Sequence, residues 1–198
     1  MPYPDRFYPV VDSIAWVKRL AALGVGTVQL RAKDLAPAQA RALVEEALAV
    51  TRGTPLKLVI NDYWQAAIEA KASHVHLGQE DLAEADVKAI RAAGLTLGLS
   101  THDEAELDNA LRCAPDYIAL GPIFPTTLKV MRFAPQGIAR IGVWKRRIGA
   151  IPLVAIGGIK LEQAAAIHAA GADSIAVVSD VTQNADPDAR VRGWLALR

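Results

Sequence analysis

Two aspartates come shortly after short apolar runs that are typical of buried parallel strands. Asp62 comes after the run 58–60, and Asp81 comes after the run 75–77. Because neighbouring parallel strands end at the same edge of a sheet, the two carboxylates are expected to converge there. Mg²⁺ prefers such carboxylate oxygens, completed by water and phosphate oxygens. The pattern therefore predicts a magnesium site, and the alternative is that both aspartates are ordinary helix N-caps.

Cationic side chains follow another apolar run, residues 27–30. Gln29, Arg31 and Lys33 alternate along the chain, so an extended backbone turns them toward one face. The planar fork of arginine and the compact charge of lysine together suit a diphosphate. Lys129, in a later loop, would add a further charge. The alternative is a solvated loop whose charges form ion pairs.

Two turns near the C-terminus have the composition of phosphate-binding loops. Gly157 and Gly158 end one apolar run, and Ser179 ends the next, where a hydroxyl and backbone amides are available. A glycine pair alone shows only a tight turn. The position of this glycine pair after the predicted strand 153–156, near the end of the chain, favours an anion site.

These turns belong to a pattern of strands alternating with helices. We expect eight strands, at residues 7–11, 27–30, 58–60, 74–77, 96–99, 117–120, 153–156 and 174–178. The helices expected between and after them span 14–23, 37–52, 65–71, 84–93, 104–113, 138–147, 162–170 and 188–197. Eight such units predict an α/β fold, a (β/α)8 TIM barrel forming a single domain over residues 1–198. An open doubly wound sheet is the alternative, although its glycine-rich dinucleotide turn is missing.

Composition narrows the class of protein. Lys+Arg number 22 against Asp+Glu 21, a net charge of +1, so no global field favours nucleic acid or an acidic membrane surface. The single cysteine, Cys113, excludes an internal disulfide. We find neither a signal peptide pattern nor an apolar run of about 20 residues that could span a bilayer. The expectation is a soluble, cytoplasmic protein. The long connection 121–137 is expected to lie over the barrel mouth.

Six segments spread over nearly the whole chain form one ordered set. They are Val-Gln-Leu-Arg-Ala-Lys-Asp (28–34), Ile-Asn-Asp (60–62), Val-His-Leu-Gly-Gln-Glu-Asp (75–81), Gly-Leu-Ser-Thr-His (98–102), Gly-Pro-Ile-Phe-Pro-Thr (121–126) and Ala-Ile-Gly-Gly-Ile (155–159). Taken together, they resemble the thiamine phosphate synthase family. The resemblance implies a transferase that joins hydroxymethylpyrimidine diphosphate to a thiazole phosphate and releases diphosphate. It independently implies the TIM barrel.

The resemblance also assigns roles to residues of this chain. The pyrimidine substrate's diphosphate would be held by Gln29, Arg31, Lys33, Asn61 and Lys129. Its Mg²⁺ would be held by Asp62 and Asp81, and Ser100 would lie beside the pyrimidine. The thiazole phosphate or departing diphosphate would contact Thr126, Gly158, Val178 and Ser179. The residues expected to act in catalysis are Arg31, Lys33, Ser100 and Lys129. Fixed cations stabilise the charge that develops on a leaving diphosphate, so a dissociative substitution needs no protein nucleophile.

Two alternatives and one departure accompany this interpretation. The family usually has Thr-x-Thr-Lys before the long loop, but Leu128 replaces the second threonine here. Related thiazole tautomerases carry a catalytic histidine where this chain has His102, which makes a tautomerase the alternative enzyme. The other alternative is a non-catalytic barrel that binds thiamine precursors. The family also suggests a homodimer.

Overall fold

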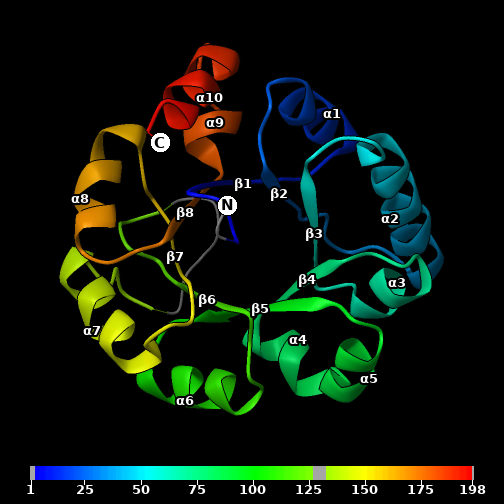
Figure 1. Ribbon diagram of the computed structural model, residues 1–198, viewed down its shortest axis with the longest axis horizontal. Coiled ribbons are helices and arrows are strands. Elements are labelled where there is room, and N and C mark those ends of the chain that lie inside the picture. The colour runs from blue at the N-terminus through cyan, green and yellow to red at the C-terminus, as the bar shows by residue number, and fades with distance from the viewer. Residues whose placement is uncertain (1–2, 127–132, 198) are drawn as a thin grey trace.

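Eight parallel strands close into a barrel in the computed structural model, which describes residues 3–126 and 133–197. The strands are β1 (Phe7–Val11), β2 (Thr27–Leu30), β3 (Lys57–Asn61), β4 (His74–Leu77), β5 (Thr96–Thr101), β6 (Tyr117–Leu120), β7 (Leu153–Ile156) and β8 (Ser174–Val177). Their order round the barrel follows the sequence, and Figure 1 shows the helices arranged outside them. The predicted (β/α)8 barrel is therefore confirmed.

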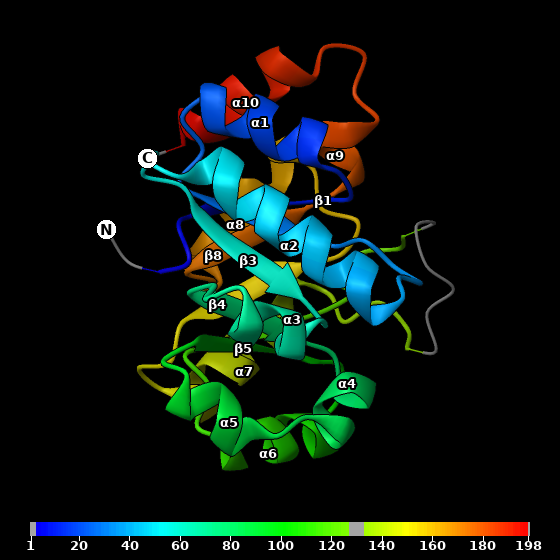
Figure 2. The same cartoon turned by 90° about the vertical axis from the view of Figure 1, so that its right-hand side faces the viewer.

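Pairing between the first and last strands closes the sheet. Phe7 of β1 lies opposite Ile175 of β8, in parallel register. Because all eight strands run the same way, their carboxyl ends form one rim, and in Figure 2 the arrow of β3 points away from the end that holds the N-terminus. The open doubly wound sheet is wrong, since that fold leaves two unpaired edges.

Helices cover the outside of the barrel. They are α1 (Ile14–Ala22), α2 (Pro37–Thr51), α3 (Trp64–Glu69), α4 (Gln79–Glu84), α5 (Val87–Ala92), α6 (Glu104–Arg112), α7 (Ile138–Ile148), α8 (Ala164–Ala169), α9 (Ser179–Thr182) and α10 (Pro187–Leu195), with a 3-10 turn at Leu161–Gln163. Apolar side chains such as Leu20, Leu107 and Trp144 are fully buried between helices and strands. This outer layer is the main hydrophobic core.

The inside of the barrel is a second, smaller core of different character. Val10, Val59 and Val154 lie there with the rings of Tyr8 and Tyr117. Both tyrosines are almost completely buried. Because a buried phenol needs a hydrogen-bond partner, this interior must hold other polar groups.

Three helices differ from the predicted elements. The helix expected at 84–93 is α5, which begins only at Val87 because Asp86 caps it by accepting a hydrogen bond from Ala89 N. The helix α4 before it was not expected. The short helix α9 was not expected at all, since four residues carry too little periodicity to detect. In the part of the chain that the structure describes, no helix is long and apolar enough to cross a membrane.

Candidate functional site

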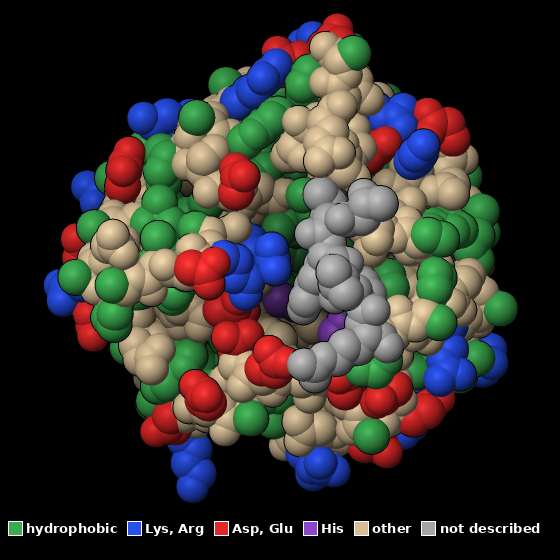
Figure 3. Space-filling model, turned by 180° about the vertical axis from the view of Figure 1, so that it is seen from behind, with side chains coloured by type: hydrophobic (Ala, Val, Ile, Leu, Met, Phe, Trp, Pro, Cys, Tyr) green, Lys and Arg blue, Asp and Glu red, His purple; other side chains and the backbone are tan. Residues whose placement is uncertain are grey.

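A cavity of about 370 Å³ opens at the carboxyl end of the barrel. Figure 3 looks at this end and shows charged side chains of both signs beside a hollow where histidines are visible. Eight of the residues predicted to bind substrate line the cavity, namely Gln29, Arg31, Asn61, Ser100, Thr126, Gly158, Val178 and Ser179. The structure thus brings together side chains from six of the eight strands or the loops after them. Lys129 and Leu128 lie outside the described residues.

The predicted cationic row divides at the end of its strand. Gln29 is buried and Arg31 half-buried, and both line the cavity. Because β2 ends at Leu30, Lys33 no longer follows the strand alternation and is exposed. It forms an ion pair with Asp62 instead. Arg31 therefore lines the cavity wall, whereas Lys33 lies outside the lining, at the rim that we define by Lys33, Asp62 and Asp81.

Asp62 and Asp81 meet at this rim, as their positions after β3 and β4 predict. Asp62 has a φ of +63°, a left-handed conformation that is uncommon outside glycine but tolerated by aspartate. Its backbone N–H donates to the carbonyl of His76 at 2.9 Å, which ties the ends of β3 and β4 together. Neither aspartate is a helix N-cap, because Tyr63 caps α3 and Gly78 caps α4. The cap alternative is wrong for both.

The surroundings of Asp81, Asp62 among them, change the protonation of its carboxyl group. Burial raises the pKa of Asp81 above its usual value, and so do the negative charge of Asp62 and a hydrogen bond with it. The charge of Lys33 opposes this rise. Two acidic groups that compete in this way form a site where either a shared proton or a bound cation relieves the repulsion.

This pair fits a magnesium ion better than a metal held entirely by protein. Among the residues that the structure describes, no group of three or more His, Cys, Asp or Glu side chains comes together at one point. Mg²⁺ is commonly held by one or two carboxylates, with waters and substrate phosphate oxygens in the remaining positions. Asp62 and Asp81 would supply the two carboxylates.

The opposite wall of the cavity is built from tight backbone turns. Gly158 has a φ of +68°, and a Cβ there would lie 2.4 Å from the carbonyl oxygen of Pro125. Only glycine fits this close approach, which brings the turn after β7 against the segment after β6. Thr126 and Gly158 thereby reach the same cavity. Backbone amides at this end of a barrel commonly bind phosphate.

The neighbouring turn after β8 is held by a charge network. Asp180, next to Ser179, accepts two hydrogen bonds from Arg190 at 2.8 and 2.7 Å and one from Trp194 Nε1 at 2.8 Å. Arg190 also makes two hydrogen bonds to Glu162, which follows the glycine turn. Hydrogen bonding to Arg190 lowers the pKa of Glu162 to about 2. The network fixes the two loops of this wall relative to each other.

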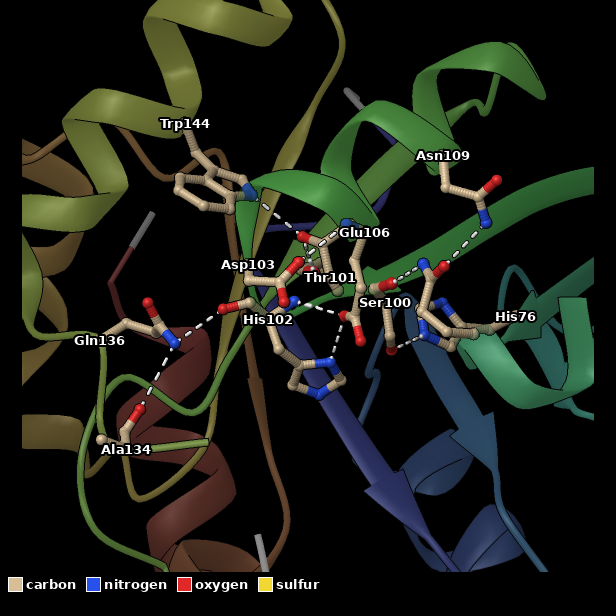
Figure 4. Close-up of polar contacts among 12 residues, drawn as sticks. His76, Ser100, Thr101, His102, Asp103, Glu106, Asn109, Ala134, Gln136 and Trp144 are labelled. Carbon is tan, nitrogen blue, oxygen red and sulfur yellow. Dashed lines mark hydrogen bonds and ion pairs between the residues drawn. The ribbon is translucent and has the colours of Figure 1, made fainter. Parts of the chain in front are cut away.

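Ser100 lies near the end of β5 and makes two hydrogen bonds, which Figure 4 shows as dashed lines. Its carbonyl oxygen accepts a hydrogen bond from Gln79 at 2.7 Å, and its hydroxyl lies 2.8 Å from Nε2 of His76. Burial lowers the pKa of His76 to about 4, although the charge of Asp62 opposes the shift. The His76 ring is therefore neutral near pH 7. His76 is not among the site residues that the sequence predicts.

His102 also lines the cavity, close to its mouth. Its Nδ1 lies 2.7 Å from Glu106, and its backbone N–H donates to the same carboxylate oxygen at 2.8 Å (Figure 4). The ring of Phe133 stacks on it at 4.8 Å, and Gln136 donates to its carbonyl oxygen at 2.8 Å. These contacts hold the end of the long connection against β5.

Asn61 contributes a donor to the cavity. Its side chain is 5% exposed, and its Nδ2 finds no hydrogen-bond partner among the described residues. A buried amide without a partner costs about 1–3 kcal/mol, which a ligand acceptor would recover. The position of Asn61 in the lining makes such an acceptor part of the expected ligand.

Comparisons with known proteins agree with this geometry. A family model described as thiamine monophosphate synthase matches residues 7–181. A thiamine-phosphate synthase of Rhizobium etli is 55% identical over 97% of this chain and 94% of its own length. One from Salmonella dublin is 53% identical over 94% of this chain and 88% of its own.

A solved structure supports the same fold at lower identity. A thiamine phosphate pyrophosphorylase from Pyrococcus furiosus superposes with a TM-score of 0.81 at 24% identity, covering 96% of this chain and 94% of that one. The family match and the full-length relatives confirm the resemblance carried by the six sequence segments. The chain belongs to the thiamine monophosphate synthase family.

Proposed function

We propose that this protein is a thiamine phosphate synthase that joins hydroxymethylpyrimidine diphosphate to a thiazole phosphate and releases diphosphate. The observation that carries the proposal is one cavity with anion-binding groups on two walls. Arg31 and the rim of Lys33, Asp62 and Asp81 lie at the ends of β2 to β4. The phosphate loops after β7 and β8 form the other wall. Two separate anion sites suit two phosphorylated substrates that react with each other between them.

The residues on the first wall act on the diphosphate. The carbon–oxygen bond to the diphosphate breaks, and the bonding electrons leave with the oxygen. Arg31 and Lys33 stabilise this developing charge more than they stabilise the bound substrate, which lowers the barrier. Lys129 would add a third cation. Asn61 donates to a diphosphate oxygen and Ser100 orients the pyrimidine.

Asp62 and Asp81 would hold a Mg²⁺ ion beside the diphosphate. When bound, the ion supplies Lewis-acid stabilisation of the leaving oxygens. Asp62 forms an ion pair with Lys33, and its carboxylate lies beside that of Asp81. Water and substrate oxygens would supply the ion's other ligands.

The residues on the second wall place the nucleophile. Gly158, Val178 and Ser179 would bind the phosphate of the thiazole through backbone amides and a hydroxyl, together with Thr126. The thiazole nitrogen then attacks the carbon that the diphosphate leaves. A barrel interior lined by Val154, Ile156 and Ala176 offers an apolar surface that excludes water from this carbon.

A product assay tests the proposal. Purified protein is mixed with both substrates and Mg²⁺, and thiamine phosphate and diphosphate are measured together. Equal amounts of the two products are expected. A tautomerase centred on His102 would convert a thiazole phosphate without any pyrimidine substrate, and a non-catalytic barrel would bind the thiazole phosphate without forming product. Either result would contradict the proposal.

A further inference from the structure

A chain of buried hydrogen bonds crosses the floor of the cavity and connects two predicted site residues. Gln29 Nε2 donates to the Tyr8 hydroxyl at 2.8 Å, which lies 2.9 Å from the Tyr117 hydroxyl. The Tyr117 hydroxyl lies 2.9 Å from Nδ1 of His76. Nε2 of His76 lies 2.8 Å from the hydroxyl of Ser100. The chain therefore runs through β2, β1, β6, β4 and β5.

The barrel is shaped to admit this chain. Tyr8, Tyr117, Gln29 and His76 are all 5% exposed or less. A Cβ at position 98 would lie 2.0 Å from the ring of Tyr117, so only glycine leaves room for that tyrosine. Buried hydroxyl and imidazole groups are costly unless each one is paired, and here each one is.

The amide of Gln29 gives the chain a direction. An amide nitrogen can only donate, so the Tyr8 hydroxyl accepts a hydrogen bond from Gln29. The Tyr8 hydroxyl in turn donates a hydrogen bond to the Tyr117 hydroxyl. Tyr117 then donates to Nδ1 of His76. Because Nδ1 accepts this hydrogen bond, the ring hydrogen is on Nε2 and is donated to Ser100. The hydroxyl hydrogen of Ser100 is not used by the chain.

The two ends of the chain consequently offer opposite hydrogen-bonding groups to the cavity. Both residues line the cavity. The chain leaves a hydroxyl hydrogen, a donor, on Ser100, and it leaves the side-chain carbonyl oxygen, an acceptor, on Gln29. An aminopyrimidine offers the complement, because its exocyclic amine donates and its ring nitrogens accept. In the corresponding oxo-pyrimidine, the exocyclic oxygen accepts and a ring nitrogen carries hydrogen and donates. The oxo compound would therefore place an acceptor opposite the Gln29 oxygen and a donor opposite the Ser100 hydroxyl hydrogen.

We propose that Tyr8, Tyr117 and His76 are positioning residues that fix the direction of this chain and thereby make the cavity selective for an amino over an oxo-pyrimidine. The proposal rests on the proposed function, because it concerns the pyrimidine substrate of that reaction. Sites built to hydrogen-bond a polar group discriminate strongly, since a wrong ligand leaves buried groups without partners. The three residues need not contact the ligand for this to hold.

The test compares two substrates in variants that lose a single hydroxyl. Tyr117→Phe keeps the ring but cuts the chain between Tyr8 and His76, so the imidazole tautomer and the Ser100 hydroxyl are no longer fixed. The ratio of kcat/KM for the aminopyrimidine diphosphate to that for its oxo analogue is expected to fall about 10- to 100-fold. Tyr8→Phe cuts the chain at another bond and is expected to lower the ratio similarly.

Tyr63→Phe is the matched control. The Tyr63 hydroxyl accepts a hydrogen bond from the backbone of Leu35 and lies outside the chain. Its loss is expected to leave the ratio unchanged. If Tyr117→Phe and Tyr8→Phe lower kcat/KM for both substrates by the same factor, the tyrosines serve only packing and the proposal is overturned.

Direct binding separates this proposal from the proposed function. If the wild-type protein turned over neither pyrimidine, the proposed function would fail. The affinities of the amino and oxo diphosphates for wild type and for Tyr117→Phe, measured by calorimetry, would still test the chain. A wild-type preference for the amino compound that weakens in the variant supports the proposal, and equal affinities in the wild type overturn it. Thermal unfolding of each variant establishes that it is folded.

Discussion

Acidification is expected to destabilise this protein through the buried imidazole of His76. The ring is neutral in the folded protein because burial lowers its pKa from 6.5 to about 4. The unfolded chain therefore binds the proton more strongly than the folded protein. The stabilising contribution is complete above pH 6.5 and is lost as the pH falls from 6.5 toward 4.

The size of the loss follows from the shift. Lowering a pKa from 6.5 to about 4 is equivalent to about 3 kcal/mol of folding free energy once the pH is below both values. At pH 5, inside this window, the loss is about 2 kcal/mol. That is a large share of the roughly 5–15 kcal/mol by which typical domains are stable.

Urea denaturation at pH 7.5 and pH 5, in wild type and His76→Gln, measures this contribution. The variant keeps an amide at the site but cannot titrate there. We expect the wild type to lose about 2 kcal/mol more than the variant between the two pH values. The comparison removes the effect of His74, whose pKa burial also lowers to about 4, because both proteins retain it. Equal losses in the two proteins would refute the account of His76.

Three further substitutions test separate parts of the site. Arg31→Ala is expected to lower kcat/KM by roughly tens- to hundreds-fold, a loss of about 2–4 kcal/mol, with the unfolding midpoint nearly unchanged; normal turnover would remove Arg31 from the site. Gly158→Ala is expected to raise KM for the thiazole phosphate more than for the pyrimidine, because its Cβ would collide with Pro125; unchanged KM values would contradict this. Leu128→Thr is expected to lower KM for the thiazole phosphate, since one recovered hydrogen bond to a charged group contributes about 1.5–3 kcal/mol; weaker binding would show that the loop has adapted to leucine.

The barrel was predictable because its signal is repeated eight times. Each strand is a short apolar run followed by a helix, and one imprecise boundary does not alter the count. The rim was predictable for the same reason, because every strand-end residue must lie at one end of a parallel barrel. Asp62 and Asp81 could be placed near each other without any knowledge of their side-chain contacts.

The hydrogen-bond chain on the cavity floor could not be predicted in this way. Tyr8 and Tyr117 occur in apolar runs, where a tyrosine usually indicates core packing. The direction in which a strand side chain points depends on strand register and barrel tilt. The sequence of one strand does not determine either of them. One signal was available, because Gly98 lies inside a predicted strand, and an interior glycine often marks the close approach of another group. Here that group is the ring of Tyr117.

The central claim, that Asp62 and Asp81 hold Mg²⁺ against a substrate diphosphate, is tested most directly by metal-dependent product formation. Thiamine phosphate is measured for wild type, Asp81→Asn and the control Glu84→Gln, an exposed carboxylate on the same helix, with and without EDTA. The account predicts that EDTA abolishes synthesis, that excess Mg²⁺ restores it, that Asp81→Asn loses most activity and that Glu84→Gln retains it. Synthesis that continues in EDTA, or full activity in Asp81→Asn, would contradict it.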